Sequence, residues 1–92
     1  MIVYAEVECM LYEGHSLKQK RSIIKSLIAK VQNTYNVTIA EIDYHDLWQR
    51  TKFAIAVVAN EYVYAEKVIY KVLAFIDNLS ELEITRTNIE RL

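Results

Sequence analysis

Proline is absent from the chain, and glycine occurs once, as Gly14, among 92 residues. No proline-, glycine- or serine-rich stretch divides the sequence and no low-complexity segment is present, so no linker between domains is indicated. The composition, 53% hydrophobic and 25% charged residues, is typical of a small globular fold and excludes a disordered chain. We therefore expect residues 1–92 to form one domain.

Cysteine is equally scarce, because Cys9 is the only one. A lone cysteine excludes a disulfide framework and a cysteine zinc site, and its place in a strand pattern predicts a buried thiol in a reducing compartment. No apolar run approaches the roughly 18 residues of a membrane span, and residues 1–6 are too polar for a signal peptide. These absences predict a cytoplasmic protein that does not engage a membrane.

Hydrophobic spacing predicts the regular elements. We expect strands over residues 2–12, 37–44, 51–59 and 82–89, and helices over residues 17–34 and 61–78. In the first strand, alternate residues from Val3 to Leu11 are apolar, while those between mix carboxylates with aromatics, which indicates one buried and one partly exposed face. Residues 51–59 are apolar on both faces, as in a central strand.

The order strand-helix-strand-strand-helix-strand predicts an α+β fold of the ferredoxin-like, or split βαβ, class. The expected sheet is antiparallel, with strand order 4-1-3-2, and both helices cover one of its faces. We expect the first and third strands to be central and to run parallel to each other.

Capping residues mark the helix ends. Ser16 is a good N-cap for the first helix, and Gln19 can return a hydrogen bond, as in a capping box. We expect Asn33 or Asn36 to end this helix in the left-handed conformation, and Asn60 to cap the second helix. The apolar stripes at helical spacing are Leu17, Ile24, Leu27, Ile28 and Val31 in the first helix, and Ala65, Val68, Ile69, Val72 and Ile76 in the second.

Positive charge is concentrated in the first helix. The net charge of −1 argues against a protein that binds nucleic acid over its whole surface. Five Lys or Arg and no acid lie between Gly14 and Ala40, so the rest of the chain holds six cations against twelve acids. Helical geometry places Lys18, Arg21 and Lys25 on one ridge. Lys20 projects to the core side, where we expect its stem on the sheet and its ammonium in water.

The start of this helix has the features of an anion site, since the first backbone N–H groups of a helix are unpaired and carry a partial positive charge. Cations in the first turn oppose the helix dipole, which favours an anionic partner. Lysine-rich surface helices, however, commonly do no more than keep their outer face in water. The candidate anion- or RNA-binding residues are His15, Ser16, Lys18, Lys20, Arg21 and Lys25.

Trp48, the only tryptophan, lies in the connection formed by residues 45–50. A large aromatic residue in a connection either folds onto the domain or anchors a partner, and both readings remain open. Tyr4, Met10 and Tyr12 on the non-helical face would extend this residue into a self-associating surface. The candidate interface residues are Tyr4, Tyr12, Leu47, Trp48 and Arg50.

No constellation of residues is typical of an enzyme. Asp43, His45, Asp46 and His15 could in principle form a metal or acid–base site. Two histidines far apart in sequence are better explained as solvated loop residues beside a capping aspartate. Neither a P-loop nor a glycine-rich dinucleotide turn is present. We therefore expect no catalytic residue, no metal and no cofactor.

The open face of a ferredoxin-like sheet is where RNA-recognition modules stack bases. Residues 50–55 lack the glycine and the aromatic spacing of that strand motif, and Glu6 and Glu8 would repel phosphates there. The first helix is therefore the better candidate for RNA than the sheet.

Four segments form a specific pattern: His-Ser-Leu-Lys-Gln-Lys-Arg-Ser at residues 15–22, Asn36-Val37 with Ala40-Glu41, Asp-Leu-Trp-Gln-Arg at residues 46–50, and Ala56-Val57-Val58. Together they resemble the YlxP-like family, a small bacterial family of unknown function, over essentially the whole chain. The resemblance implies a ferredoxin-like fold and no established activity. Genes for transcription-termination, ribosome-maturation and translation-initiation factors often neighbour those of its relatives, which implies an RNA-related role. Tyr44 departs from the family where a second histidine or another polar residue is expected, and this argues against a paired-histidine site.

The sequence therefore predicts a non-enzymatic binding module that acts on RNA or a ribosomal particle through its cationic helix. The alternative is a protein-interaction or self-assembling, homodimeric module whose basic ridge meets an acidic partner. Salt dependence separates the two, because phosphate contacts give a steep linear loss of log affinity with log salt.

Overall fold

The computed structural model describes residues 1–12 and 15–92. Its elements are β1 (Ile2–Leu11), α1 (Leu17–Thr34), β2 (Thr38–Asp43), β3 (Arg50–Val58), α2 (Tyr62–Asp77) and β4 (Leu82–Arg91). The type and order of all these elements agree with the prediction, and each boundary falls within two residues of the expected one.

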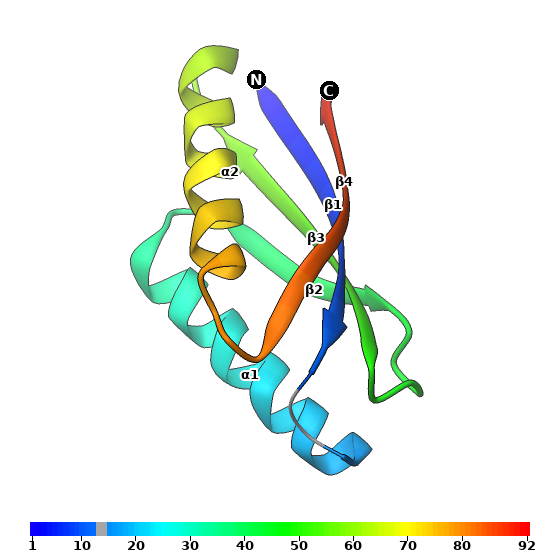
Figure 1. Ribbon diagram of the computed structural model, residues 1–92. Coiled ribbons are helices and arrows are strands. Elements are labelled where there is room, and N and C mark those ends of the chain that lie inside the picture. Colours follow the sequence, from blue (N-terminus) through cyan, green and yellow to red (C-terminus); the bar gives the residue numbers. More distant parts are fainter. Residues whose placement is uncertain (13–14) are drawn as a thin grey trace.

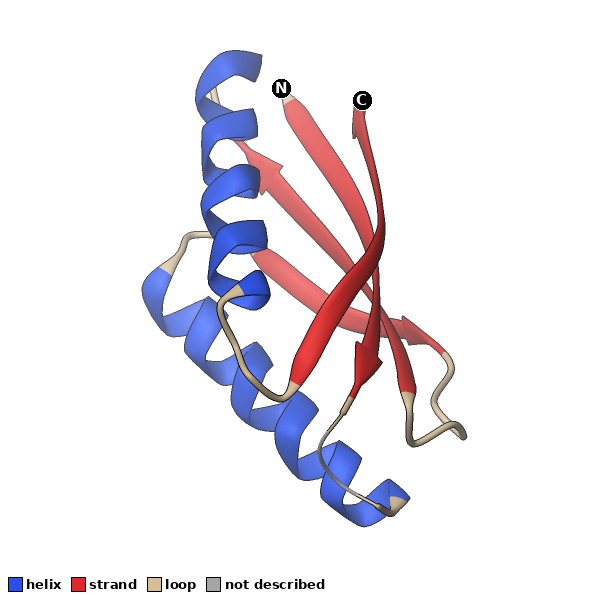
Figure 2. Ribbon diagram, in the orientation of Figure 1, coloured by secondary structure: helices blue, strands red, loops and turns tan. Residues whose placement is uncertain are grey.

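The strands form one sheet in the order β2-β3-β1-β4, and both helices lie on the same face of it (Figures 1 and 2). The predicted ferredoxin-like α+β fold is confirmed. The expected parallel arrangement of the first and third strands is wrong, because β1 pairs with β3 antiparallel. The α1 crossover leaves β2 running in the direction of β1, and the connection from β2 to β3 then reverses the chain.

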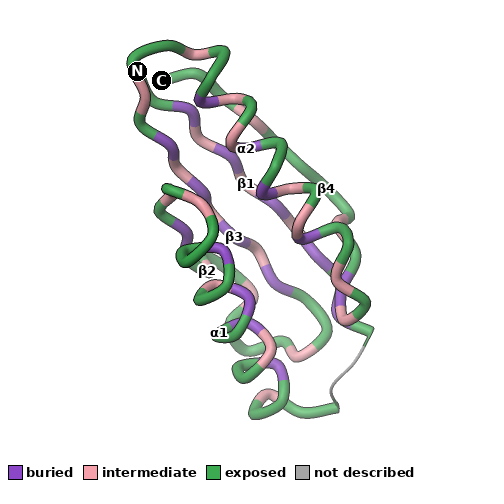
Figure 3. The backbone as a smooth tube through the Cα atoms, turned by 90° about the vertical axis from the view of Figure 1, so that its left-hand side faces the viewer, coloured by how far each residue is buried: buried purple, intermediate pink, exposed green. Residues whose placement is uncertain are grey.

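The core lies between the sheet and the helices. Alternate residues of β1, from Val3 to Leu11, are all buried, as are Phe53 and Ile55 of β3, and Figure 3 shows this alternation along the strands. Each helix contributes one buried stripe: Ile24, Leu27 and Val31 from α1, and Ala65, Ile69, Val72 and Ile76 from α2. Burial of each large aliphatic side chain stabilises the fold by about 1.5–3 kcal/mol, so these stripes hold the helices on the sheet.

The start of α1 is capped as the sequence predicts. The Gln19 N–H donates to Ser16 Oγ at 3.2 Å, which satisfies one of the unpaired N–H groups of the first turn. The Gln19 side chain accepts from the backbone N–H of His15 rather than from that of Ser16. Gly14, the other residue expected at this junction, lies outside the described residues.

The other predicted helix ends differ from those observed. Neither Asn33 nor Asn36 adopts the left-handed conformation: α1 ends at Thr34, its C-cap Tyr35 has φ −123°, and the chain passes directly into extended backbone toward β2. The N–H of Tyr35 donates to the Val31 carbonyl at 2.8 Å, so the last turn of α1 is closed without a left-handed residue. The N-cap of α2 is Glu61 rather than Asn60, and no side chain caps it. Neither helix of the described chain is long and apolar enough to cross a membrane.

Substitution of the α1 cap tests the helix start. Ser16→Ala removes the oxygen that accepts from Gln19, and we expect the free energy of unfolding to fall by about 0.5–2 kcal/mol. Urea denaturation followed by far-UV circular dichroism measures this change. Ser22→Ala, at an exposed position on the same helix, is the control and should leave the midpoint nearly unchanged. An unchanged midpoint for Ser16→Ala would contradict the capping role.

The reactivity of the Cys9 thiol tests whether the inner face of β1 stays buried. Burial raises the pKa of Cys9 to about 12, with a smaller contribution from Asp77, so the reactive thiolate is scarce at neutral pH. We expect no alkylation of the native protein by iodoacetamide within hours at pH 8, and complete alkylation in urea, as measured by mass spectrometry. Rapid modification of the native protein would show that β1 opens to solvent.

Candidate nucleic-acid interface

Lys20 is buried beneath the first turn of α1. Only 1% of its surface is exposed, and its ammonium lies 3.1 Å from Glu41 Oε2 and donates to the backbone carbonyl of Tyr44 at 2.6 Å. The expectation that this ammonium reaches water is therefore wrong. The lysine projects from the core side of the helix over the end of β2, where an acid and a carbonyl take the place of solvent.

Glu41 links three parts of the fold. Its Oε2 atom accepts from the hydroxyl of Thr51, a fully buried residue of β3, at 2.6 Å. Its Oε1 atom lies 3.8 Å from Nε2 of His45, and the same nitrogen lies 3.2 Å from the Glu41 carbonyl. Sequence reasoning did not identify Glu41 as a partner of Lys20. The available signal was the core-facing lysine itself, since a buried ammonium requires an acid.

Tyr44 is the first residue of the connection between β2 and β3. It is the only non-glycine residue with positive φ (62°) in the described chain, and its N–H donates to Asp43 Oδ1 at 2.7 Å. Its carbonyl faces Lys20, whereas its hydroxyl donates to Glu8 Oε1 at 2.9 Å on the opposite face of the sheet. The Arg50 guanidinium lies 4.1 Å from the centre of the Tyr44 ring, within cation–π range. These contacts outweigh the local cost of left-handed backbone.

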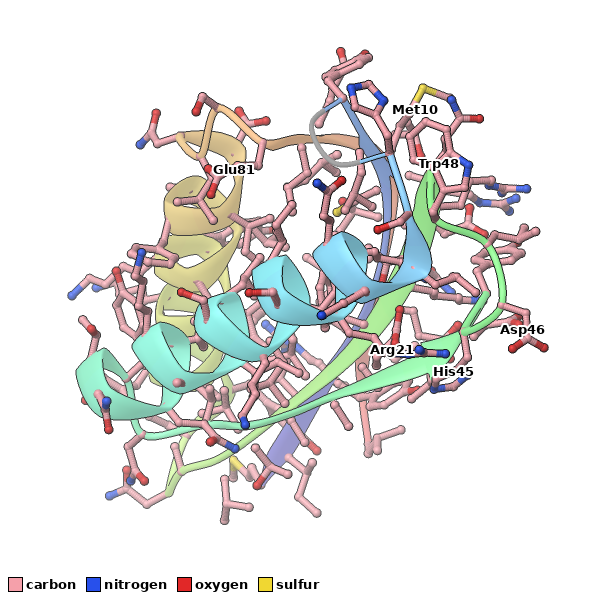
Figure 4. The ribbon with its side chains drawn as sticks, turned by 90° about the horizontal axis from the view of Figure 1, so that it is seen from below. Met10, Arg21, His45, Asp46, Trp48 and Glu81 are labelled. Atoms are coloured by element: carbon pink, nitrogen blue, oxygen red, sulfur yellow. The ribbon has the colours of Figure 1, made fainter. Side chains whose placement is uncertain are left out.

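The three cations of the α1 ridge face solvent, unlike Lys20. Lys18, Arg21 and Lys25 are all exposed, and the first turn contains no acid. Figure 4 shows Arg21 extending from α1 on the side of the β2–β3 connection where His45 lies. Lys30, on another side of the helix, is also exposed. The surface available to an anion at the ridge therefore consists of Lys18, Arg21 and Lys25 without Lys20.

The connection that holds Trp48 lies against the start of α1. The rings of His15 and Trp48 meet edge to face, with centroids 5.8 Å apart and planes at 64°. Trp48 is half-buried, and Figure 4 shows Met10 of β1 beside it. The neighbouring Leu47 remains 47% exposed. The cationic helix start and the loop that holds Trp48 were predicted as two separate sites, and the structure places them in contact.

The five candidate interface residues do not form one patch. Tyr4 of β1 lies eight residues before Tyr12, which directly follows the strand, about 26 Å away at 3.3 Å per residue of extended chain, and its hydroxyl donates to Glu6 at 2.8 Å. The hydroxyl of Tyr12 donates to Glu83. Arg50 is engaged by Tyr44 and lies 3.8 Å from Glu8. Of the five, only Leu47 and Trp48 lie in the loop and, among the described residues, have no side-chain hydrogen bond or ion pair.

The open face of the sheet is polar and internally compensated. Lys52 Nζ lies 3.0 Å from Glu6 Oε1, and this contact holds the pKa of Glu6 below and that of Lys52 above their usual values. The same carboxylate raises the pKa of Tyr4. A hollow of about 180 Å³ on this face is lined by Glu6, Glu8, Lys52, Arg86 and Asn88. The carboxylates of β1 are thus neutralised by neighbouring cations instead of projecting an uncompensated negative field.

The residues considered for a metal or acid–base site are separated. His15 contacts Trp48, His45 contacts Glu41, and Asp43 accepts from the Tyr44 N–H. In residues 1–12 and 15–92, no three His, Cys, Asp or Glu side chains are grouped in a way that could hold a metal ion. Of the four residues considered, His15, His45 and Asp43 each have a contact that accounts for the position of the side chain.

The fold and this surface define a small ferredoxin-like domain with a cationic first helix beside an aromatic loop. Residues 2–89 match the family described as "Protein of unknown function (DUF503)", and the chain belongs to this family. It is 50% identical over 90 residues, 98% of each chain, to a protein of Bacillus subtilis (strain 168) called "Uncharacterized protein YlxP". The resemblance to the YlxP-like family is confirmed.

The buried ion pair makes a directional prediction for stability. Glu41→Ala leaves the ammonium of Lys20 buried with only the Tyr44 carbonyl, and we expect the free energy of unfolding to fall by about 3–5 kcal/mol. Lys20→Met should cost less, because Glu41 is partly exposed and keeps the Thr51 hydroxyl. Urea denaturation of both variants and the double variant measures the coupling. Equal and small losses would show that the pair does not anchor α1.

Proposed function

We propose that this protein is a non-enzymatic, cytoplasmic module that binds single-stranded RNA, free or within a ribosomal particle. The binding surface consists of Lys18, Arg21 and Lys25 on α1 together with Trp48. The observation that supports this proposal most directly is the contact between Trp48 and His15, which sets an aromatic ring at the start of the cationic helix. Phosphates and bases then have adjacent places on one surface.

Charge placement supports phosphate binding at this position. Lys18 and Arg21 lie in the first turns of α1, where cations oppose the positive end of the helix dipole. No acid of α1 compensates them, and the one inward lysine is already neutralised by Glu41. A bound phosphate would relieve the mutual repulsion and accept from backbone N–H groups of the helix start that Ser16 does not use.

Trp48 supplies what the cations lack, a surface for a base. Stacking on an aromatic side chain contributes about 1–3 kcal/mol per base and tolerates any sequence. The edge-on contact with His15 holds the tryptophan ring in place. Recognition of this kind requires unpaired bases, so we expect single-stranded segments to bind better than duplexes.

Affinity measurements test both halves of this surface. We expect Lys18→Glu with Arg21→Glu to reduce binding of fluorescent oligouridine at least about tenfold at low salt and to lower the salt slope by roughly 1.4, since two phosphate contacts are lost. Trp48→Ala should weaken binding with an unchanged slope, because stacking releases no counterions. Fluorescence anisotropy over a series of salt concentrations gives both quantities.

The matched control is Lys67→Glu with Lys71→Glu, an equal change of charge at exposed positions of α2. Equal losses from both double variants would show diffuse attraction only. Absence of RNA binding by the wild-type protein at low salt would overturn the proposal.

The alternative occupant of the same ridge is an acidic protein. A pull-down from lysate with and without ribonuclease separates the two readings, because an RNA-bridged association disappears after the treatment. A ribonuclease-resistant acidic protein that is lost from the Lys18→Glu and Arg21→Glu variant would favour the protein partner.

A further inference from the structure

The outer edge of β4 is an open site for another strand. β4 is ten residues long and lies at the end of the sheet, where it pairs only with β1 (Figure 2). Within residues 1–12 and 15–92, no segment pairs with its other side. The opposite edge strand, β2, is shorter, with six residues, and its pairing with β3 is irregular. A row of unpaired backbone N–H and C=O groups of this length can template a further strand.

Two exposed residues of opposite charge on β4, Arg86 and Glu90, lie two positions to either side of Asn88. On the open face, Arg86, Asn88 and Glu90 stand opposite Glu8, Glu6 and Tyr4 of β1. The register is regular over this part of the strand, since its shift lies before Arg86. Among the described residues, neither Arg86 nor Glu90 has an ion-pair or hydrogen-bond partner for its side chain, although Glu6 and Glu8 of the same face both do.

We propose that β4 pairs antiparallel with β4 of a second copy of this chain about a two-fold axis at Asn88, joining the two sheets into one. In this register Arg86 stands opposite the partner's Glu90, and Glu90 stands opposite the partner's Arg86. Cross-strand neighbours of opposite charge stabilise a sheet, and a two-fold axis makes both pairs at once. A shift of register by two residues removes both pairs, so the charges select this alignment.

The exposed surface of α2 beside β4 also favours a second copy of the chain as the partner. Glu66 of α2 reaches over β4 and contacts Arg91 at 2.6 Å, which identifies the side of α2 that faces the edge. Val63 and Tyr70 flank Glu66 on the helix surface, at i−3 and i+4, and are 56% and 58% exposed. Pairing of β4 with its copy brings these apolar side chains toward those of the partner, and the apolar area removed from water then favours association.

This assembly leaves the proposed RNA surface free. α1 packs against β2, at the other edge of the sheet, so the ridge and Trp48 lie away from the axis. The dimer is therefore independent of the proposed function, and failure of either proposal does not affect the other.

Charge reversal at the two positions tests the assembly. In sedimentation velocity over a range of concentrations, the wild-type protein is expected to form dimers, and Arg86→Glu and Glu90→Arg alone to raise the dissociation constant at least tenfold. The double variant should recover dimerisation. A 1:1 mixture of the two single variants should form a heterodimer, detectable by native mass spectrometry, because each reversed charge then meets its opposite. Lys71→Glu changes charge equally on the side of α2 that faces Tyr35 and β3, away from the edge, and should leave the dimer intact.

A monomeric wild-type protein at all concentrations would overturn the proposal, as would single variants that remain dimeric or a mixture that forms no heterodimer. Far-UV circular dichroism establishes that the variants are folded. If a single variant does not fold, amide hydrogen exchange of the wild-type protein decides. The proposal requires protection that rises with concentration in residues 85–91, and a rise confined to β2 or absent everywhere would contradict it.

Discussion

The buried contact between Lys20 and Glu41 is the interaction on which the rest of the molecule depends. Moving a charge out of water costs several kcal/mol, so the pair persists only with further hydrogen bonds. The Tyr44 carbonyl and the Thr51 hydroxyl supply them, from the end of β2 and from β3. One ion pair therefore joins the first helix, an edge strand, a central strand and the connection between those strands. The position of α1 along the sheet follows from it.

That position determines the electrostatic character of the surface. With Lys20 turned inward, the helix periodicity directs Lys18, Arg21 and Lys25 to solvent. The carboxylates of β1 on the open face are matched by Lys52 and Arg50, whereas α1 has no acid beside its ridge, so unmatched positive charge is concentrated there although the net charge is −1. The loop that follows Tyr44 returns Trp48 to the start of the same helix. Charge and aromatic surface thus coincide through core packing and not through proximity in sequence.

The sequence was sufficient for the features that depend on local periodicity and insufficient for those that depend on tertiary neighbours. Alternation in β1 and the stripes of both helices identified the core, and Ser16 identified a helix start. The direction of β1 relative to β3 was mistaken although the predicted element order determines it: the crossover through α1 keeps β2 in the direction of β1, and the connection to β3 then reverses the chain. Asn60 was preferred as a cap for its side chain, but the helix begins one position later, with Glu61 at the N-cap and no side-chain hydrogen bond to cap it.

The candidate site shows the same division. The ridge of exposed cations was predictable, since it requires only the spacing of residues along one helix. The inward path of Lys20 was recognised, but the acid that meets it was not, because Glu41 lies 21 positions away in a strand most of whose residues are exposed. The contact between His15 and Trp48 joins segments more than 30 residues apart and could be found only from the fold.

The position of Tyr44 has two requirements that conflict: a left-handed backbone, and a large aromatic side chain that reaches across the sheet. Glycine or asparagine would adopt this conformation at lower cost, but neither could offer both a phenol to Glu8 and a ring to Arg50. Tyrosine meets the side-chain demand and leaves the backbone demand to its neighbours. A substitution at this position therefore either lowers the cost of the left-handed backbone or keeps the contacts with Glu8 and Arg50. No standard amino acid does both.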